Sequence, residues 1–561
     1  MDISTNILAV NSLQVAFEGE QPFIAVKNTS FNIAKGRTLA IVGESGSGKS
    51  ITALSIMGLL PKNANLSGSI CLQTADKNYE LADIQKNKYW QDIRGKEIGM
   101  IFQEPMSSLN PVMTVGKQLA EAIITHQDIS KKEAKQAAIS WLQKVQLPDP
   151  ATIYERYPHQ LSGGQKQRVM IAMAICNHPV LLIADEPTTA LDVTVQQEII
   201  RLIQYLQEEY NTALIFITHG LALAATIADE VIVMYKGEVV EYGTAEQVLK
   251  HPVYAYTKAL IACKPSPEQK DHKLPVVADF LNNNSKVFVS KEPYAKIITE
   301  SELLKVNDLK IWFPEEKNFL GVPQSYFKAV DGVSFSLRKG EVLGLVGESG
   351  CGKSTLGKSL IGLLPVTEGH ILFENKDITD ISNKEWRGIR TKVQMIFQDP
   401  YASLNPRMTI GNMLTEPLLM HDIVPAKEVE KEVERLIDIV HLPKDSFKKY
   451  PHEFSGGQRQ RIGIARALAL RPELLICDES VSALDVSVQA QILNLLKELQ
   501  QEFQLSYLFI SHDLAVVHYI SDRVMVMEKG KIVESGEAEQ VLKHPANEYT
   551  RRLIHAIPEL K

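Results

Sequence analysis

The sequence predicts an α/β fold that occurs twice in tandem, each copy built on a mostly parallel sheet. Three observations predict it. The chain has 561 residues, which is too long for a single hydrophobic core. A glycine-rich octapeptide occurs twice, at Gly43–Ser50 and at Gly347–Ser354. In both halves, short apolar runs alternate with amphipathic helical patterns, which is the pattern of a sheet covered by helices.

The repeat continues beyond the octapeptide, with one difference in spacing. Gly43 recurs as Gly347, an offset of 347 − 43 = 304, and Gln103 recurs as Gln398, an offset of 398 − 103 = 295. The first copy therefore holds 304 − 295 = 9 more residues between these points. We expect them to form a surface loop in the polar stretch 73–88.

A polar, proline-rich stretch separates the two copies. Residues 264–300 contain Pro265, Pro267, Pro275 and Pro293, which prevent one continuous helix. We expect a linker here. The predicted domains are a first module at 1–263 and a second at 301–561.

Composition narrows the class of protein. The chain has 67 acidic against 60 basic residues, whereas nucleic-acid binders usually carry a basic excess. We expect no membrane span and no secretory signal, because no apolar stretch reaches the required length and the N-terminus lacks a basic, then apolar, pattern. The five cysteines form no pairing pattern and are expected to be reduced structural thiols.

Short apolar runs are expected to be the buried strands of each sheet. They are Thr38–Val42, Leu181–Ala184 and Ala213–Ile217 in the first copy, and Val342–Val346, Leu474–Cys477 and Tyr507–Ile510 in the second. Polar motifs follow the ends of these runs, where parallel sheets place phosphate chemistry. Between two of the runs, Ser130 and Glu133 have the spacing of a capping box at the start of an amphipathic helix.

The glycine-rich octapeptide predicts a loop that binds phosphate. Its glycines let backbone N–H groups wrap phosphate oxygens, and the following helix adds the positive end of its dipole. Lys49 and Lys353 are expected to reach the β- and γ-phosphates, while Ser50 and Ser354 are expected to bind Mg²⁺. The residues expected to bind nucleotide here are Gly43, Glu44, Ser45, Gly46, Ser47, Gly48, Lys49, Ser50 and Ile51, and Gly347, Glu348, Ser349, Gly350, Cys351, Gly352, Lys353, Ser354 and Thr355.

Acidic pairs and histidines follow the later strands of each copy. Asp185-Glu186 and Asp478-Glu479 come directly after four apolar residues. The aspartates are expected to hold Mg²⁺, and the glutamates to polarise the attacking water as general bases. Gln103 and Gln398 are expected to contact Mg²⁺ or this water. His219 and His512 are expected to contact a γ-phosphate and to complete the catalytic set.

A second anion site is expected at a helix N-terminus in each copy. The tetrapeptide Ser-Gly-Gly-Gln precedes helices expected at Lys166–Cys176 and Arg459–Leu470. A serine N-cap followed by small residues exposes N–H groups, although a plain N-cap is the alternative interpretation. Since one phosphate loop needs no second anion site, we expect this motif to serve the other module's nucleotide. The residues are Ser162, Gly163, Gly164 and Gln165, and Ser455, Gly456, Gly457 and Gln458.

In this order the motifs resemble those of the ATP-binding-cassette (ABC) family: Walker A, Q-loop, signature, Walker B, D-loop and H-switch. Asp192 and Asp485 match its D-loop. The resemblance covers nearly the whole chain apart from the linker. It implies two P-loop NTPase modules, each a RecA-like core with a helical subdomain, and ATP and Mg²⁺ as cofactors. It also implies that the modules close head to tail, so that Walker A of one copy meets the signature of the other.

A narrower resemblance is to the oligopeptide/dipeptide/nickel importer subfamily, and in its fused form to ATPases of microcin C-type peptide and glutathione importers. The motifs that carry it are Tyr157–His159, Tyr450–His452, Ser108–Pro111 and Ser403–Pro406, and the closing pairs Tyr256-Thr257 and Tyr549-Thr550, each preceded by His-Pro. It implies ATP-driven peptide import with two transmembrane permease subunits and a solute-binding protein. The implied location is the cytoplasmic face of the bacterial inner membrane, without nucleic acid as a partner.

The copies depart from the family pattern at a few positions. Ile51 stands where the second copy has Thr355, and Gly220 follows His219 where Asp513 follows His512. Ser480 replaces the usual proline after Glu479. Because no reacting group is lost, both sites are expected to hydrolyse ATP, the first more slowly. Candidates for the aromatic ring that stacks on adenine are Phe23, Tyr326 and Phe327.

A tandem ABC factor that acts on the ribosome is the alternative function. Such a factor is expected to have a long, helical, strongly basic linker. Residues 264–300 contain six lysines and five acidic residues, so this stretch is nearly neutral and is interrupted by proline. The sequence therefore favours the transporter subunit and leaves its substrate open.

Overall fold

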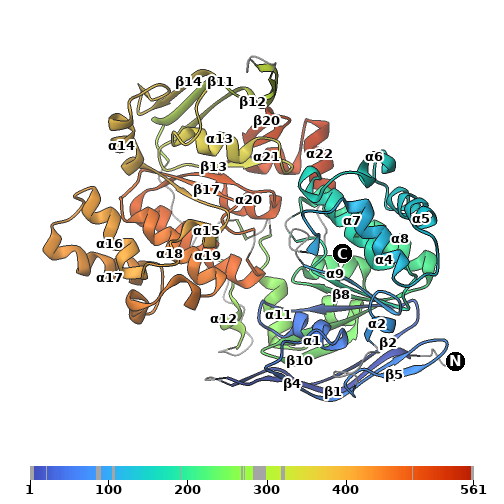
Figure 1. The fold of residues 1–561 in the computed structure, drawn as a ribbon. Helices are drawn as coiled ribbons and strands as arrows, with labels where there is room; N and C mark the ends of the chain where they lie inside the picture. Colours follow the sequence, from blue (N-terminus) through green and yellow to red (C-terminus); the bar gives the residue numbers. More distant parts are fainter. Residues whose placement is uncertain are drawn as a thin grey trace. The chain divides into compact units, whose positions relative to one another are not determined.

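The computed structural model describes residues 6–19, 22–83, 90–103, 108–189, 191–266, 269–270, 272–281, 298–317, 323–482 and 484–556. They form two compact units. The first unit is built on the chain up to Ile261, and the second on Ala262–Asp279 together with the described residues from 298 onward. In Figure 1 the first unit runs from blue to green and the second reaches red.

The first unit is organised around a six-stranded sheet in the order β10-β9-β3-β8-β7-β6. Its strands are β3 (Thr38–Val42), β6 (Ile98–Ile101), β7 (Leu181–Asp185), β8 (Ala213–Thr218), β9 (Glu230–Tyr235) and β10 (Glu238–Thr244). All neighbours pair parallel except β9 and β10. Every residue of β3, β7 and β8 is buried, as expected for strands covered on both faces.

A smaller antiparallel sheet and a set of helices cover the six-stranded sheet. The small sheet has the order β2-β1-β4-β5 and consists of β1 (Asn6–Phe17), β2 (Phe23–Ala34), β4 (Ala64–Gln73) and β5 (Asn78–Glu80). The helices are α1 (Lys49–Ile56), α2 (Trp90–Ile93), α4 (Val115–Ile124), α5 (Lys131–Lys144), α6 (Pro150–Tyr154), α7 (Gly163–Ile175), α8 (Val193–Tyr210), α9 (Leu221–Ile227), α10 (Ala245–Lys250) and α11 (Ala255–Ala262). Figure 1 shows α4, α5 and α7 side by side, as the helical subdomain between β6 and β7.

The second unit repeats this architecture. Its sheets have the orders β16-β17-β18-β13-β19-β20 and β12-β11-β14-β15. The strands are β11 (Glu302–Lys317), β12 (Pro323–Arg338), β13 (Val342–Val346), β14 (Glu368–Phe373), β15 (Lys376–Asp377), β16 (Val393–Ile396), β17 (Leu474–Asp478), β18 (Ser506–Ile510), β19 (Arg523–Glu528) and β20 (Lys531–Glu537). The helices are α12 (Val277–Leu281), α13 (Lys353–Leu360), α14 (Asn383–Lys392), α15 (Pro400–Ser403), α16 (Ile410–Met420), α17 (Val429–Ile439), α18 (Gly456–Leu468), α19 (Val486–Phe503), α20 (Leu514–Ile520), α21 (Ala538–Lys543) and α22 (Glu548–His555). The predicted fold class is confirmed.

Two local expectations need correction. The signature helices begin at Gly163 and Gly456, three residues earlier than expected, because the serine caps and the glutamine three residues later form complete capping boxes. The extra residues of the first copy do not all lie in 73–88. From Gly58 to Gly68 the first copy spans 68 − 58 = 10 positions, and from Gly362 to Gly369 the second spans 369 − 362 = 7, so three of them lengthen the segment that leads into β4.

Two further findings concern membrane-spanning helices and the cysteines. Among the described residues, no helix is long and apolar enough to cross a membrane. None of the five cysteines forms a disulfide, and all except the half-buried Cys71 are buried. Burial raises the pKa of Cys176 and of Cys477 to about 12, so both stay protonated at neutral pH.

A segment between the two copies binds tightly to the second unit. Asn494 of α19 pairs with the backbone of Leu274: the Leu274 N–H donates to Asn494 Oδ1 and Asn494 Nδ2 donates to the Leu274 carbonyl, both at 2.8 Å. Tyr519 Oη donates to the His272 carbonyl at 2.9 Å, and Lys497 Nζ donates to the carbonyl of Lys270. We call the described residues from Lys270 to Leu274 the strap.

We predict that Asn494→Ala releases the strap. The substitution leaves a buried N–H and a buried carbonyl of Leu274 without partners, at a cost of about 1–3 kcal/mol in the free energy of unfolding. Denaturant unfolding and limited proteolysis around residue 270 measure the effect. Arg201→Ala is the matched control, because Arg201 is exposed and occupies the corresponding position of the first copy, 293 residues earlier (494 − 293 = 201). Equal proteolysis of the two variants would contradict the prediction.

Candidate active sites

The glycine-rich loop of each unit connects a central strand to a helix. In the first unit it joins β3 to α1, and Gly43, Gly46 and Gly48 all have positive φ angles. A Cβ on Gly48 would lie 2.7 Å from the carbonyl oxygen of Ala25, so close packing also demands glycine there. The second unit repeats this geometry between β13 and α13. Both loops therefore have the tight shape that phosphate binding requires.

The lysine of each loop is buried and folded back over the loop. Lys49 Nζ donates to the carbonyls of Gly43 at 2.7 Å and Glu44 at 2.8 Å. Lys353 Nζ donates to the corresponding carbonyls of the second loop, both at 2.8 Å. Only 5% and 4% of these two lysines is exposed. The ammonium groups are thus held in the loop itself, where a phosphate would meet them.

A hydroxyl and a buried carboxylate meet beside each lysine. Ser50 Oγ donates to Asp185 Oδ1 at 3.1 Å, and Ser354 Oγ donates to Asp478 Oδ1 at 2.9 Å. Burial, supported by the neighbouring glutamate charge, raises the pKa of Asp185 to about 6 and also raises the pKa of Asp478. Oxygen ligands are those that Mg²⁺ prefers, and its charge would favour the ionised form of these carboxylates. The residues therefore fit the predicted cation.

The structure brings the predicted catalytic glutamate, glutamine and histidine together in each unit. Glu186 Oε2 accepts from Gln103 Nε2 at 3.1 Å and lies 3.3 Å from His219 Nδ1. Glu479 Oε2 accepts from Gln398 Nε2 at 2.7 Å and lies 3.4 Å from His512 Nδ1. The side chains come from the ends of β6, β7 and β8, and of β16, β17 and β18. Neighbouring parallel strands end at the same edge, which explains why they meet.

Ion pairing keeps both glutamates charged. Burial alone raises the pKa of a carboxyl group, but the hydrogen bond and charge of His219 outweigh it, so the pKa of Glu186 lies below its usual range. The same balance with His512 lowers the pKa of Glu479. Burial lowers the pKa of His512, yet the hydrogen bond with Glu479 leaves it raised. A charged carboxylate is the form that a general base needs.

One contact of the first glutamate was not predicted. Thr189 Oγ1 donates to Glu186 Oε2 at 3.0 Å, whereas Ser482, at the same position of the second copy, donates to the backbone carbonyl of Glu479 at 2.9 Å. The substitution of threonine for serine is the only signal in the sequence, and it does not reveal which oxygen accepts. The first site therefore holds its glutamate with an additional hydrogen bond.

The signature residues begin a helix that packs against the helix after the D-loop. Ser162 and Ser455 are N-caps, and each accepts a hydrogen bond from the N–H of the glutamine three residues later. A Cβ on Gly164 would lie 2.7 Å from Val195 Cγ1 in the first turn of α8. Gly163 and Gly456 are exposed, so this end of each helix faces solvent within its own unit. The role of the signature toward the other copy's nucleotide stays a prediction.

The departures between the copies have local consequences. Asp513 caps α20 by accepting from the N–H groups of Ala515 and Val516, at 2.9 and 3.3 Å. Gly220 has no side chain to cap α9 at the matching position.

Two of the candidates for the aromatic ring that stacks on adenine have different surroundings. Phe327 is half exposed and lines a cavity of about 220 Å³ beside the second loop. Phe23, in contrast, is 58% exposed and stacks on Phe17.

Together, the parallel sheet, the glycine-rich loop and the carboxylate beside it define a P-loop nucleotide hydrolase that carries an ABC-type signature helix. A family model described as "ABC transporter" matches residues 26–189 and 330–482. A second, described as "Oligopeptide/dipeptide transporter, C-terminal region", matches residues 240–288 and 533–561. The chain belongs to the ABC transporter family, as a tandem ATP-binding protein with the oligopeptide/dipeptide type of C-terminal region.

Similar proteins agree with this membership. The chain is 48% identical to the glutathione import ATP-binding protein GsiA of Escherichia coli strain K12 over 562 residues, which is 99% of this chain and 90% of that protein. It is also 48% identical to GsiA of Shigella boydii over 564 residues, with the same coverage. Among solved structures, CbiO1 from Clostridium perfringens is 29% identical, with a TM-score of 0.39, and covers 44% of this chain and 92% of that one. The family model and the similarity to GsiA confirm the predicted ABC ATPase.

Proposed function

We propose that this chain hydrolyses ATP at two sites to drive import of glutathione or of small peptides with similar chemistry. The proposed ATP hydrolysis rests on the cluster of glutamate, glutamine and histidine, which is complete in both units. The proposed substrate is supported by the similarity to GsiA over nearly the whole chain and by the oligopeptide/dipeptide C-terminal region.

The residues of each site have separate roles in binding and hydrolysis. Lys49 and Lys353 bind the β- and γ-phosphates, and the N–H groups of the glycine-rich loops wrap their oxygens. Glu186 and Glu479 accept a proton from the attacking water, while His219 and His512 orient it against the γ-phosphate. The residues that would hold Mg²⁺ are Ser50, Gln103 and Asp185, and Ser354, Gln398 and Asp478, and the bound cation would neutralise phosphate charge. ATP binding closes the two copies head to tail, with each signature completing the other copy's site.

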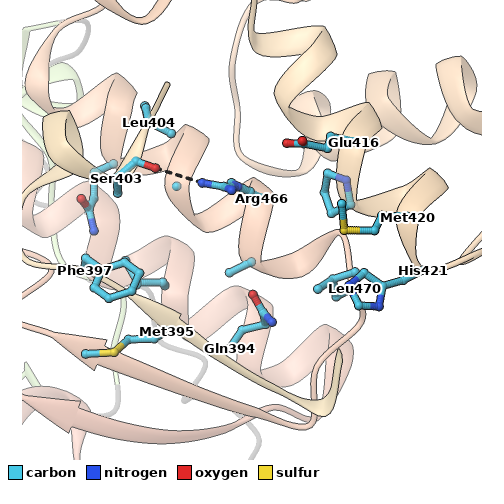
Figure 2. A pocket seen from close by; sticks show the side chains of 15 residues that line it. Gln394, Met395, Phe397, Ser403, Leu404, Glu416, Met420, His421, Arg466 and Leu470 are labelled. Atoms are coloured by element: carbon cyan, nitrogen blue, oxygen red, sulfur yellow. Dashed lines mark hydrogen bonds between the residues drawn. The ribbon is translucent and has the colours of Figure 1, made fainter. Parts of the chain in front are cut away.

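A groove beside Gln398 is proposed as the docking site of a permease subunit. The cavity has a volume of about 380 Å³ and lies between β16, α16 and α18. Figure 2 shows Phe397 and Met395 on one side, Glu416 and Met420 on another, and Arg466 between them, donating to the Ser403 carbonyl at 2.9 Å. Exposed apolar groups next to one acid and one arginine suit a short amphipathic segment. This contact would hold the ATPase at the cytoplasmic face of the membrane.

We predict that Met420→Glu uncouples the permease without removing ATP binding. Met420 is 56% exposed at the groove, and a carboxylate there faces Glu416 in a site proposed to bind an apolar segment. Copurification with the permease subunits should fall at least about tenfold, the loss of roughly 1.4 kcal/mol of contact energy. Leu281→Glu, at an exposed position outside the groove, is the matched control. Normal copurification of Met420→Glu would contradict the docking site.

Reconstitution with permeases and a solute-binding protein tests the substrate. We expect glutathione or small peptides to stimulate ATP hydrolysis in proteoliposomes, and other classes of solute to leave it at its basal rate. Stimulation by ribosomes, with a flat response to every peptide, would favour the alternative function instead.

A further inference from the structure

The closing motif of each copy contains a tyrosine that contacts the phosphate loop. Tyr256 in α11 and Tyr549 in α22 are 3% and 4% exposed. The N–H of Glu44 donates to Tyr256 Oη at 3.2 Å, and the N–H of Glu348 donates to Tyr549 Oη at 3.0 Å. More than 200 residues separate the partners in each pair, since 256 − 44 = 212 and 549 − 348 = 201. Both C-terminal regions thus reach back to the start of their own loop.

The contacted peptide unit also holds the phosphate-binding lysine. The N–H of Glu44 and the carbonyl of Gly43 belong to one rigid peptide plane. Its carbonyl accepts from Lys49 Nζ at 2.7 Å while its N–H donates to Tyr256. In the second unit the plane between Gly347 and Glu348 is held in the same way, by Lys353 at 2.8 Å and by Tyr549. Rotation of this plane would move the lysine's acceptor, so the hydroxyl fixes the lysine indirectly.

The helix that carries each tyrosine is itself anchored to the central sheet. Glu241 of β10 accepts from the N–H groups of Val253 and Tyr254, at 2.7 and 3.4 Å. Glu534 of β20 accepts from the N–H groups of Ala546 and Asn547, at 2.7 and 3.2 Å. Each carboxylate therefore binds the chain just before the tyrosine helix. The hydroxyl is consequently presented to the loop from a fixed support.

The contact persists although the surroundings of the ring differ. Tyr256 packs against Tyr235, with ring centroids 4.2 Å apart. The second copy has Glu528 at the position of Tyr235, because 235 + 293 = 528. The hydroxyl contact with the loop is present in both copies, although this ring partner is not. This argues that the hydroxyl, and not merely the apolar ring, is what each position requires.

We propose that Tyr256 and Tyr549 are positioning residues for ATP binding, which act through the first peptide plane of the phosphate loop. The inference rests on the proposed nucleotide sites and deepens them. It assigns a role to the oligopeptide/dipeptide C-terminal region: this region pre-organises the loop of its own module for phosphate. Because each tyrosine serves one loop, the two sites can be tuned separately.

Tyr256→Phe and Tyr549→Phe test the proposal in the full-length chain. Phenylalanine keeps the buried ring and removes only the hydroxyl. We expect each single variant to weaken ATP binding at one site about 3- to 10-fold, the usual worth of one such hydrogen bond. The double variant should raise the KM for ATP by this factor while kcat stays within about twofold. Amide hydrogen exchange should quicken in the peptides that contain Glu44 and Glu348.

Tyr507→Phe is the matched control. Tyr507 is fully buried and its hydroxyl donates to the Leu496 carbonyl at 2.8 Å. It lies near the start of β18, whereas His512 follows the end of this strand. The control substitution should lower the melting temperature without changing the KM for ATP. If the two tyrosine variants lower only the melting temperature, with unchanged KM and exchange, the proposal is wrong. Direct binding of ATP is measured as well, because the proposal concerns binding. A failure of the catalytic assignment would appear differently, as turnover that survives the loss of both glutamates.

Discussion

Replacing both Glu186 and Glu479 by glutamine is expected to lower ATP hydrolysis by about 10²–10⁴, which is the usual contribution of a positioned base. Glutamine keeps the size and a hydrogen-bonding oxygen but cannot accept the water's proton. Each carboxylate is held charged beside a histidine and a glutamine, so the substitution removes its basic function and not its support. Phosphate release by the purified protein measures the loss.

Nucleotide binding serves as the control for this double variant. The phosphate-loop lysines are held by carbonyls of their own loops, and the substitutions leave these hydrogen bonds in place, so ATP affinity should be retained. The single variants then report each site alone, and we expect the first site to contribute the smaller rate. Turnover equal to that of the unmodified chain would rule out the assignment of Glu186 and Glu479 as bases.

Gly352→Ala is expected to abolish most ATP binding at the second site. Gly352 is the N-cap of α13, with φ of 109°, and a Cβ there would overlap the carbonyl oxygen of Ala329. The conformation alone costs an L residue about 1–3 kcal/mol, and relieving the overlap must move the loop or β12. The affinity for ATP should therefore fall by roughly 100-fold or more. Equilibrium binding of a fluorescent ATP analogue measures it.

Gly350→Ala separates steric overlap from backbone strain. Gly350 lies in the same loop with φ of 80°, but a Cβ there would meet no atom within 4 Å. Its substitution bears the conformational cost without the collision, so we expect a clearly smaller loss of affinity. Equal losses in the two variants would show that close packing on Ala329 does not matter.

Much of the fold follows from local signals in the sequence. The six apolar runs expected as strands are strands within one residue at either end, because each is short, buried on both faces and followed by a polar motif. The Ser130 and Glu133 capping box is present as predicted. The beginning of α7 was harder to predict, because glycine is a poor helix former and only the complete capping box extends the helix over Gly163 and Gly164.

The candidate sites were predictable where a motif repeats, and less so where contacts are distant. The meeting of Glu186, Gln103 and His219 follows from their places at strand ends. The donation from Thr189 depends on a single hydroxyl rotamer, which no pattern encodes. The bond between Asn494 and Leu274 joins positions 494 − 274 = 220 residues apart, and a mid-helix asparagine gives no sign of a partner so distant.

The strap makes residues that precede the second copy of the motifs part of the fold of the second unit. Asn494, Lys497 and Tyr519 hold residues that precede the second half in the chain, whereas the first half has Arg201, Gln204 and Thr226 at the corresponding positions. A second half that lacked the strap would lose the backbone groups that Asn494, Lys497 and Tyr519 bind. For the same reason, a second half expressed from its own gene should start at Ala262, so that it brings its strap with it.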